Sequence, residues 1–164
     1  AEAFAGEVAI SMLADDAATR AVILDSGALA ATRPGLVHLG MATLSTDFVG
    51  ELLERHRHHG IAYVAAPVFG RPDVAAAGQL NILAAGPAEA VARVQPLLDV
   101  LGSRTWLLGE DPLHAAAVKI AGNFMIASVP STVVGTIAPT ISPVRKPKNS
   151  TTTLITITVV STNT

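Results

Sequence analysis

The sequence predicts an α/β fold around a mainly parallel sheet, and three observations lead to this prediction. Short apolar runs that suit buried strands alternate with longer amphipathic runs that suit helices. Hydrophobic residues make up 50% of the chain and charged residues 15%, which is typical of thin apolar strands and alanine-rich helices. The length of 164 residues suits one domain of ordinary size. Strands and helices that alternate at this spacing predict right-handed crossovers between parallel strands.

The first half of the chain predicts three strands with a helix in each of the two intervals. The expected strands are residues 8–13, 36–39 and 61–66. The expected helices are residues 17–24 and 48–56. Asp15 and Asp16 offer an N-cap for the first helix, Gly27 ends it, and residues 43–46 hold capping residues for the second. In the second helix, apolar residues recur three and four positions apart, so they share one face.

The second half of the chain predicts two more strands and two more helices. The expected strands are residues 80–85 and 105–108. A helical period runs through residues 88–101, where Pro96 should kink the helix or split it in two. A last helix should begin near Leu113 and run past Asn123.

The composition changes abruptly at residue 130. Residues 130–164 contain ten threonines, four serines, four prolines and no acidic residue. The 13 acidic and eight basic residues before this point give a charge of −5, whereas the three basic residues after it give +3. Such a shift marks a boundary, so residues 130–164 are predicted to be a Thr/Ser/Pro-rich tail that is either non-native or disordered. Within it, residues 154–160 suit either a strand or an aggregation-prone segment.

Composition also excludes several classes of function. The net charge of −2 gives no reason to expect a nucleic-acid partner. The chain has no cysteine, which rules out disulfides and thiolate metal sites, and we expect no metal. No apolar run approaches the roughly 20 residues of a membrane span, so no membrane partner is expected. The start of the chain does not resemble a secretory signal and lacks an initiator methionine, so we expect a cytoplasmic protein that is cut or processed at its front end.

Six short sequence motifs follow one another along the chain. They read VAISMLADD at 8–16, MATLS at 41–45, APVFGRP at 66–72, AAGQL at 76–80, QPLL at 95–98 and KIAGNF at 119–124. Together they resemble the β-hydroxyacid dehydrogenase family, which includes 3-hydroxyisobutyrate dehydrogenases, 6-phosphogluconate dehydrogenases and, more distantly, imine reductases. The resemblance covers about residues 3–128.

This resemblance implies a fold and a domain division. Residues 1–118 would be the C-terminal portion of a Rossmann-like NAD(P)-binding domain, the second half of a doubly wound, mainly parallel sheet. Residues 119–129 would begin an interdomain helix. The resemblance also implies NAD or NADP as cofactor, a small-molecule substrate, and a homodimer in the intact parent enzyme.

The chain departs from the family pattern at several places. It contains no Gly-x-Gly, although members of the family open with a glycine-rich loop that admits the cofactor pyrophosphate. The residue that would read the ribose 2′ position is also missing, so the preference between NAD and NADP is not readable. In the substrate loop, the Ser-Gly-Gly of the family is replaced by Phe69, Gly70 and Arg71.

Lys119 and Asn123 are the sharpest site candidates. Lys119 is the only lysine before residue 130, and Asn123 lies four residues later on the same helix face. The resemblance implies that the lysine acts as general acid/base and that the amide holds the substrate. A buried amine can exchange a proton near neutral pH. The alternative is a surface lysine near the start of a helix.

The other candidates follow the ends of strands or occupy the substrate loop. In the resemblance, Leu13, Ala14 and Thr43 contact the cofactor, although the first two equally suit ordinary core and Thr43 equally suits a helix N-cap. Phe69, Gly70 and Arg71 would bind the substrate. For Gly70 the alternative is a plain turn glycine, and for Arg71 it is a solvated loop side chain.

A histidine-rich segment, residues 55–59, invites a metal interpretation, because His56 and His59 are one helical turn apart. Two histidines without a nearby carboxylate make a poor zinc site. We therefore expect a solvated helix end, where positive charge is favoured.

Two functions remain open from the sequence. The first is an NAD(P)-dependent oxidoreductase that transfers a hydride between nicotinamide and a small 3-hydroxy acid or its carbonyl, or an imine. The second is a non-catalytic remnant or binding module with a Rossmann-like fold, inactive because the glycine-rich loop and second domain are absent.

Overall fold

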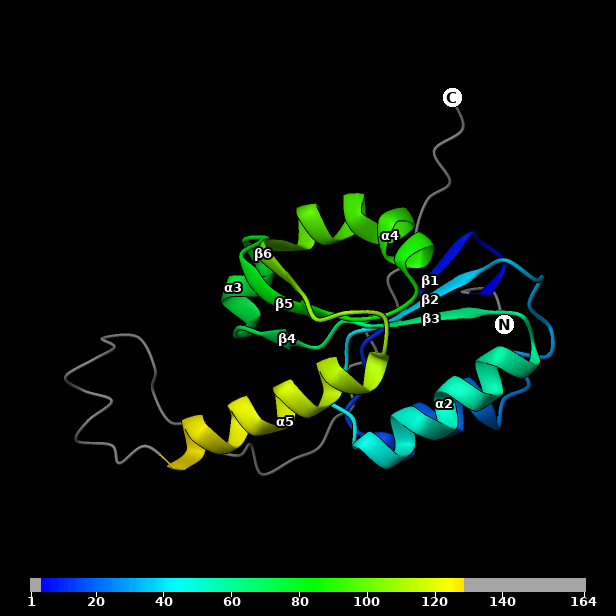
Figure 1. The fold of residues 1–164 in the computed structure, drawn as a ribbon, viewed down its shortest axis with the longest axis horizontal. Helices are drawn as coiled ribbons and strands as arrows, with labels where there is room; N and C mark the ends of the chain where they lie inside the picture. The colour runs from blue at the N-terminus through cyan, green and yellow to red at the C-terminus, as the bar shows by residue number, and fades with distance from the viewer. Residues whose placement is uncertain (1–3, 129–164) are drawn as a thin grey trace.

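A computed structural model describes residues 4–128, and the predictions for residues 130–164 lie outside this range. Helices cover both faces of a central sheet (Figure 1). The elements, in chain order, are β1 (Val8–Ser11), α1 (Asp16–Thr19), η2 (Arg20–Leu24), β2 (Val37–Gly40), α2 (Thr46–His58), β3 (Ala62–Ala65), β4 (Val68–Phe69), α3 (Pro72–Ala76), β5 (Leu80–Ala84), α4 (Ala88–Leu101), β6 (Gly102–Leu107) and α5 (Pro112–Ser128).

Strands β3 and β4 behave as one strand that is interrupted at Pro67. Strands β1, β2 and β3 pair in parallel, as do β5 and β6. The antiparallel pairs that join β3 and β4 to β5 are Ala65 with Ala85, Val68 with Ile82, and Phe69 with Asn81. These pairs share one register, because each step forward on the first strand is matched by a step back on β5. The strands therefore form one sheet in the order β1, β2, β3/β4, β5, β6.

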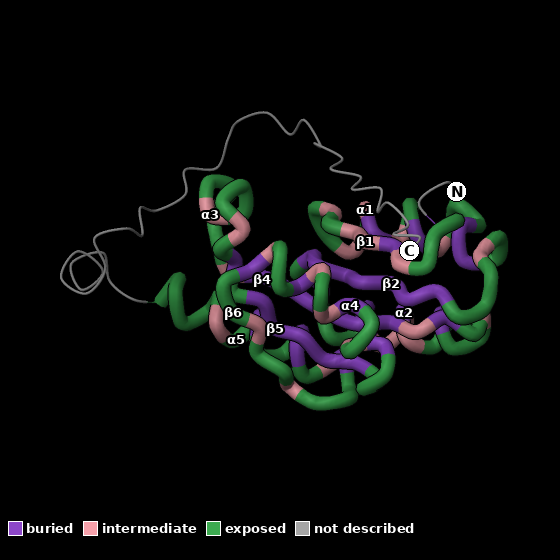
Figure 2. The backbone as a smooth tube through the Cα atoms, turned by 90° about the horizontal axis from the view of Figure 1, so that it is seen from above, coloured by how far each residue is buried: buried purple, intermediate pink, exposed green. Residues whose placement is uncertain are grey.

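The two faces of the sheet carry separate apolar layers, and the inner strands β2, β3 and β5 form the buried core between them (Figure 2). On β2, Val37 and Leu39 belong to the layer that packs under α4. His38 lies on the opposite face and stacks on His56 of α2. Helices α2 and α5 pack side by side on this second face. This alternation explains why β2 is buried along its whole length.

The expected helix over residues 17–24 was only partly right. Its N-cap is confirmed, because the Asp15 carboxylate accepts a hydrogen bond from Ala18 N at 2.8 Å. After one turn of α-helix, however, residues Arg20–Leu24 form a π-helical turn that Asp25 N closes by donating to Arg20 O. The wider turn lies beyond what apolar periodicity can distinguish.

The prediction that Pro96 splits the helix in two is wrong, because α4 continues as one helix through this residue. Pro96 lies on the exposed side of the helix, so its ring does not disturb the packing of Val94 and Leu98 against the sheet. The helix loses one backbone hydrogen bond there and is held by its buried face.

The stretch that resembles a substrate loop contains regular structure that the sequence did not predict. β4 comes directly after Pro67, and α3 follows with Pro72 in its first turn. Gly70 joins them at a φ of +155°, and a Cβ there would lie 2.6 Å from a methyl group of Leu80. The backbone conformation and the crowding by Leu80 both favour glycine at position 70, whether or not a substrate approaches it.

Replacement of Gly40 by alanine is expected to destabilise the domain by about 2 kcal/mol, because overpacking in a rigid core forces neighbours to move. An added Cβ would overlap the hydroxyl of Tyr63 and lie 2.8 and 2.9 Å from two of its ring carbons. Gly50 of α2 is the matched control, since a Cβ there meets nothing within 4 Å. Gly50→Ala should gain about 0.5–1 kcal/mol. Urea unfolding of both variants measures the difference, and equal midpoints would contradict the packing at Gly40.

Candidate active site at the carboxyl edge of the sheet

The carboxyl ends of β1, β2 and β3/β4 lie along one edge of the sheet, because these strands run parallel. Leu13 and Ala14 follow β1, and Thr43 follows β2. Leu13 is half-buried against the α2-side core, whereas Ala14 and Thr43 are exposed. Such an edge is where α/β sheets bind their ligands.

The turns after β1 and β2 are tied together by one carboxylate. Asp16 accepts hydrogen bonds from Ser45 N at 3.0 Å and from Ser45 Oγ at 2.5 Å. Ser45 Oγ in turn accepts from Phe48 N at 3.2 Å, so Ser45 is the N-cap of α2. The alternative assignment of Thr43 as the N-cap is therefore wrong, and its exposed hydroxyl is not used for capping. The hydrogen bonds between Asp16 and Ser45 therefore hold together the turns after β1 and β2, which carry the predicted cofactor contacts.

Lys119 lies at this edge with a buried side chain that is only 7% exposed. Its Nζ is 3.7 Å from the centroid of the Phe69 ring. Within residues 4–128 no carboxylate is at ion-pair distance from it. Within that range, every fully buried side-chain nitrogen has a hydrogen-bond partner. Nζ of Lys119 has none, so it is not fully buried and keeps some contact with solvent. Desolvation lowers the pKa of Lys119 below its ordinary value. The alternative of a surface lysine is wrong.

The other residues predicted for substrate binding have different surroundings. Asn123 follows Lys119 by one turn of α5 and is exposed. Arg71 is also exposed, and its guanidinium is paired with Asp73, with Nε 3.1 Å from Oδ1. The structure therefore brings Phe69 and Lys119 together and places Arg71 in a local ion pair of α3.

A buried polar chain crosses the layer between β1, β2 and α2, and the sequence reasoning missed it. Ser11 Oγ lies 2.8 Å from His38 Nε2, and His38 Nδ1 lies 2.7 Å from His56 Nε2. His56 Nδ1 is 2.6 Å from Leu52 O. Tyr63 packs against both rings, with centroids 5.3 and 5.0 Å away. A histidine inside an apolar strand was the available signal for this chain.

The prediction that His56 lies at a solvated helix end is wrong, because the side chain is 1% exposed. Burial lowers the pKa of His56 to about 4 and the pKa of His38 well below its usual range, so both rings are neutral near pH 7. In the described part of the chain, no group of three potential metal-ligating side chains comes together.

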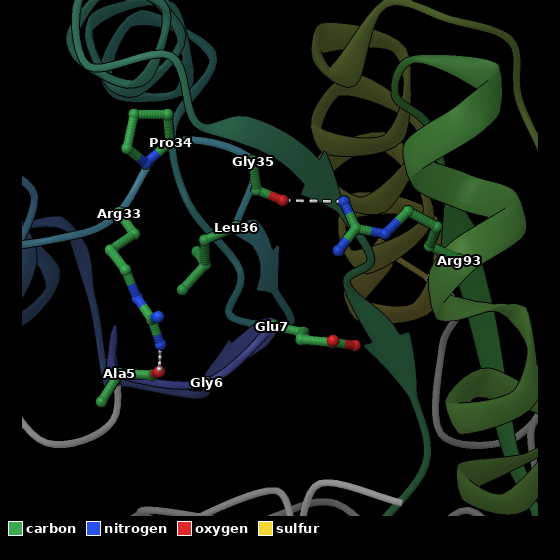
Figure 3. A pocket seen from close by; sticks show the side chains of 8 residues that line it. All are labelled: Ala5, Gly6, Glu7, Arg33, Pro34, Gly35, Leu36 and Arg93. Atoms are coloured by element: carbon green, nitrogen blue, oxygen red, sulfur yellow. Dashed lines mark hydrogen bonds between the residues drawn. The ribbon is translucent and has the colours of Figure 1, made fainter. Parts of the chain in front are cut away.

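A pocket of about 490 Å³ lies at the opposite edge, beside the amino ends of β1 and β2 (Figure 3). Two arginines line it, and each already donates to a backbone carbonyl: Arg33 to Ala5 O at 3.2 Å, and Arg93 to Gly35 O at 2.7 Å. The amino ends of parallel strands are not the usual ligand edge. We therefore place the candidate active site at the carboxyl edge, with Lys119.

None of the helices in residues 4–128 combines the length and apolarity needed to span a membrane.

Comparison with known families adds an independent finding. Residues 1–109 match the family described as the NAD-binding domain of 6-phosphogluconate dehydrogenase. The chain is 40% identical over 124 residues to an uncharacterized oxidoreductase, YfjR, of Bacillus subtilis (strain 168). That match covers 75% of this chain and 43% of the relative. The chain thus spans less than half the length of this curated relative.

Solved structures agree with the fold. A 3-hydroxyisobutyrate dehydrogenase of Mycobacterium tuberculosis with L-serine has a TM-score of 0.70 at 26% identity, over 76% of this chain and 42% of that one. An imine reductase of Myxococcus stipitatus in complex with NADP+ has a TM-score of 0.64 at 25% identity, over 80% of this chain and 44% of that one. These likenesses confirm the predicted Rossmann-like α/β fold.

Proposed function

The chain belongs to the β-hydroxyacid dehydrogenase family, and from this premise we propose that it contributes the proton-transfer residue to an NAD(P)-dependent oxidoreductase. The reaction would be hydride transfer between nicotinamide and a small 3-hydroxy acid or its carbonyl, or an imine. One observation carries the proposal: a desolvated lysine amine with remaining solvent contact lies at the carboxyl edge of the sheet.

The residues at this edge fit the nicotinamide end of NAD or NADP. Thr43 and Ala14 are both exposed, so a ribose or a nicotinamide ring would be able to contact them. Leu13 offers an apolar contact beside them. The bound cofactor would supply or accept the hydride. The pyrophosphate end has no match in this chain, which contains no Gly-x-Gly.

In the proposed mechanism, the chain itself orients the substrate and moves one proton. Nζ of Lys119 would take the proton from the substrate hydroxyl during oxidation and return it during reduction. Asn123 would hold the substrate through its amide, and residues Phe69 to Arg71 would border it on the β4 side. Desolvation of the amine lowers the free energy needed to remove its proton near neutral pH.

Titration with NADH and NADPH, followed by nicotinamide fluorescence, tests the proposal. We expect saturable binding and oxidation or reduction of one member of a panel that contains 3-hydroxyisobutyrate, L-serine and a cyclic imine. A chain that binds neither cofactor would contradict the proposed function. That result would favour the second candidate, a non-catalytic binding module.

A further inference from the structure

The amine of Lys119 is covered by an aromatic ring where a charged or hydrogen-bonding neighbour would be expected. Nζ lies 3.7 Å from the centroid of Phe69, which is contact distance for the face of the ring. Within residues 4–128, the structure gives this nitrogen neither an ion pair nor a hydrogen bond. Among the described residues, the Phe69 ring is therefore a direct contact of an amine that has no ionic or hydrogen-bonding partner.

Gly122 explains how the ring comes so close to the helix. It lies three residues after Lys119 on α5, and a Cβ at this position would be 2.5 Å from Cζ of Phe69. Residues three apart share a helix face, so Gly122 and Lys119 meet the same ring. A glycine inside a helix costs about 1 kcal/mol relative to alanine, and the close approach of Phe69 accounts for its presence.

The ring acts on the amine in two opposite ways. Its face attracts the ammonium form through the negative potential of the π system. Its bulk displaces water and thereby favours the neutral amine, and burial is the cause that lowers the pKa of Lys119. An aliphatic side chain of similar size would keep the second effect and lose the first.

We propose that Phe69 is a positioning residue that holds the Lys119 amine against its ring face and sets the balance between the charged and neutral forms. The proposal rests on the proposed role of Lys119 in proton transfer. It assigns to Phe69 a function beyond bordering the substrate, and it gives Gly122 a reason to lack a side chain.

Competitive acetylation at Lys119 as a function of pH tests this directly, since only the neutral amine reacts. Acetic anhydride is the reagent, Nα-acetyl-lysine in the same tube is the reference, and peptide mapping isolates the Lys119 signal. Phe69→Leu keeps an apolar side chain over the amine but removes the ring face that attracts the ammonium form. The titration midpoint of Lys119 should therefore fall. Phe69→Ala admits water, so the midpoint should rise. Each change should alter the labelling rate about threefold or more at a fixed pH below the midpoint.

Two further variants separate ring contact from general packing. Gly122→Ala should push the ring aside and move the midpoint in wild-type protein, but should have no further effect in Phe69→Leu, because the smaller side chain leaves room. Phe124→Leu makes the same exchange on α5 at an aromatic residue that is 73% exposed, and should leave the midpoint unchanged.

Shifts of the same sign in Phe69→Leu and Phe69→Ala would overturn the proposal, as would an unchanged midpoint in both. The measurement uses neither cofactor nor substrate, so it is separate from the test of the proposed function. If Phe69 sets the midpoint but Lys119 is dispensable for turnover, the proposed proton transfer fails while the contact remains. If Lys119 is essential but the Phe69 variants leave its titration unchanged, only the present inference fails.

Discussion

Replacement of Lys119 by methionine is expected to lower kcat by about 10²–10⁴, the usual contribution of one general acid/base, while cofactor affinity changes little. Methionine preserves the length and apolar contacts of the buried stem and removes only the amine that lies over Phe69. Steady-state rates with the substrate identified in the panel, together with cofactor titration, separate the two effects. The loss should appear in kcat and kcat/KM alike, because the group acts in the transition state.

Two companion variants sharpen this result. Lys119→Arg keeps a positive charge but cannot release its proton near neutral pH. If residue 119 transfers a proton, this variant should be nearly as inactive as Lys119→Met. Val118→Ala alters the exposed neighbour on the same helix and should leave turnover unchanged. Retention of more than a tenth of wild-type kcat in Lys119→Met would remove the lysine from the mechanism.

The pH dependence of turnover should have opposite signs in the two directions. Oxidation needs the neutral amine as base, so its rate should rise with pH through the pKa of Lys119. Reduction needs the ammonium as acid, so its rate should fall over the same interval. Because burial lowers the pKa of Lys119, both limbs should lie below the pH at which an ordinary lysine titrates.

The sequence predicted the element order well because apolar period and capping residues are local properties. The helix predicted at residues 88–101 is α4 with the same bounds, and the N-cap at Asp15 is confirmed. The resumption of the strand after Pro67 was not predictable in this way. The two-residue strand β4 is defined by pairing with β5, a contact between distant segments that no local pattern encodes.

The candidate site shows the same division. Spacing placed Lys119 and Asn123 on one helix, and the resemblance gave the lysine a role. The ring over the amine depends on the docking of β4 against α5, which the sequence does not state. His56 was misjudged because its charged neighbours suggested solvent, whereas its own position follows Phe48, Val49 and Leu52 around the buried face of α2. Helical phase was the better guide than local charge.

Acidification from pH 7 to pH 4 is expected to remove about 3 kcal/mol of stability through His56 alone, since one pKa unit corresponds to about 1.4 kcal/mol. Its pKa is lowered from 6.5 to about 4 in the folded state, so the unfolded chain binds the proton first as the pH falls. The contribution is therefore complete above pH 6.5 and is lost progressively down to about pH 4. His38, whose pKa burial also lowers, adds to the loss.

Among the groups around the two rings, the Leu52 carbonyl raises the pKa of His56, but the larger effect of burial outweighs it. Tyr63 on β3 stays uncharged because burial raises its pKa, and Ser11 on β1 does not ionise in this range. The charge on His59 further lowers the pKa of His56. Glu54 and Glu110 line the same pocket as His56, and Glu54 is already paired with Arg57.

The hydrogen-bond directions determine which ring nitrogen of each neutral histidine carries the proton. Leu52 O only accepts, so His56 carries its proton on Nδ1 and accepts at Nε2 from His38 Nδ1. His38 then accepts at Nε2 from the Ser11 hydroxyl. Nitrogen-15 spectra at pH 7.5 should show both rings neutral with the proton on Nδ1, and a protonated ring or an Nε2–H form would contradict this chain.

Urea unfolding between pH 7 and pH 4 measures the stability loss, and paired variants assign it. His38→Leu/His56→Leu replaces both rings by apolar side chains and should flatten the pH dependence, because apolar replacement of a buried polar pair is often tolerated. His58→Gln removes an exposed histidine from the same helix and should leave the slope unchanged. No other histidine that the structure describes is as deeply buried as these two, so we expect them to carry the acid sensitivity. If the double variant lost stability with falling pH as steeply as the wild-type protein, this assignment would be wrong.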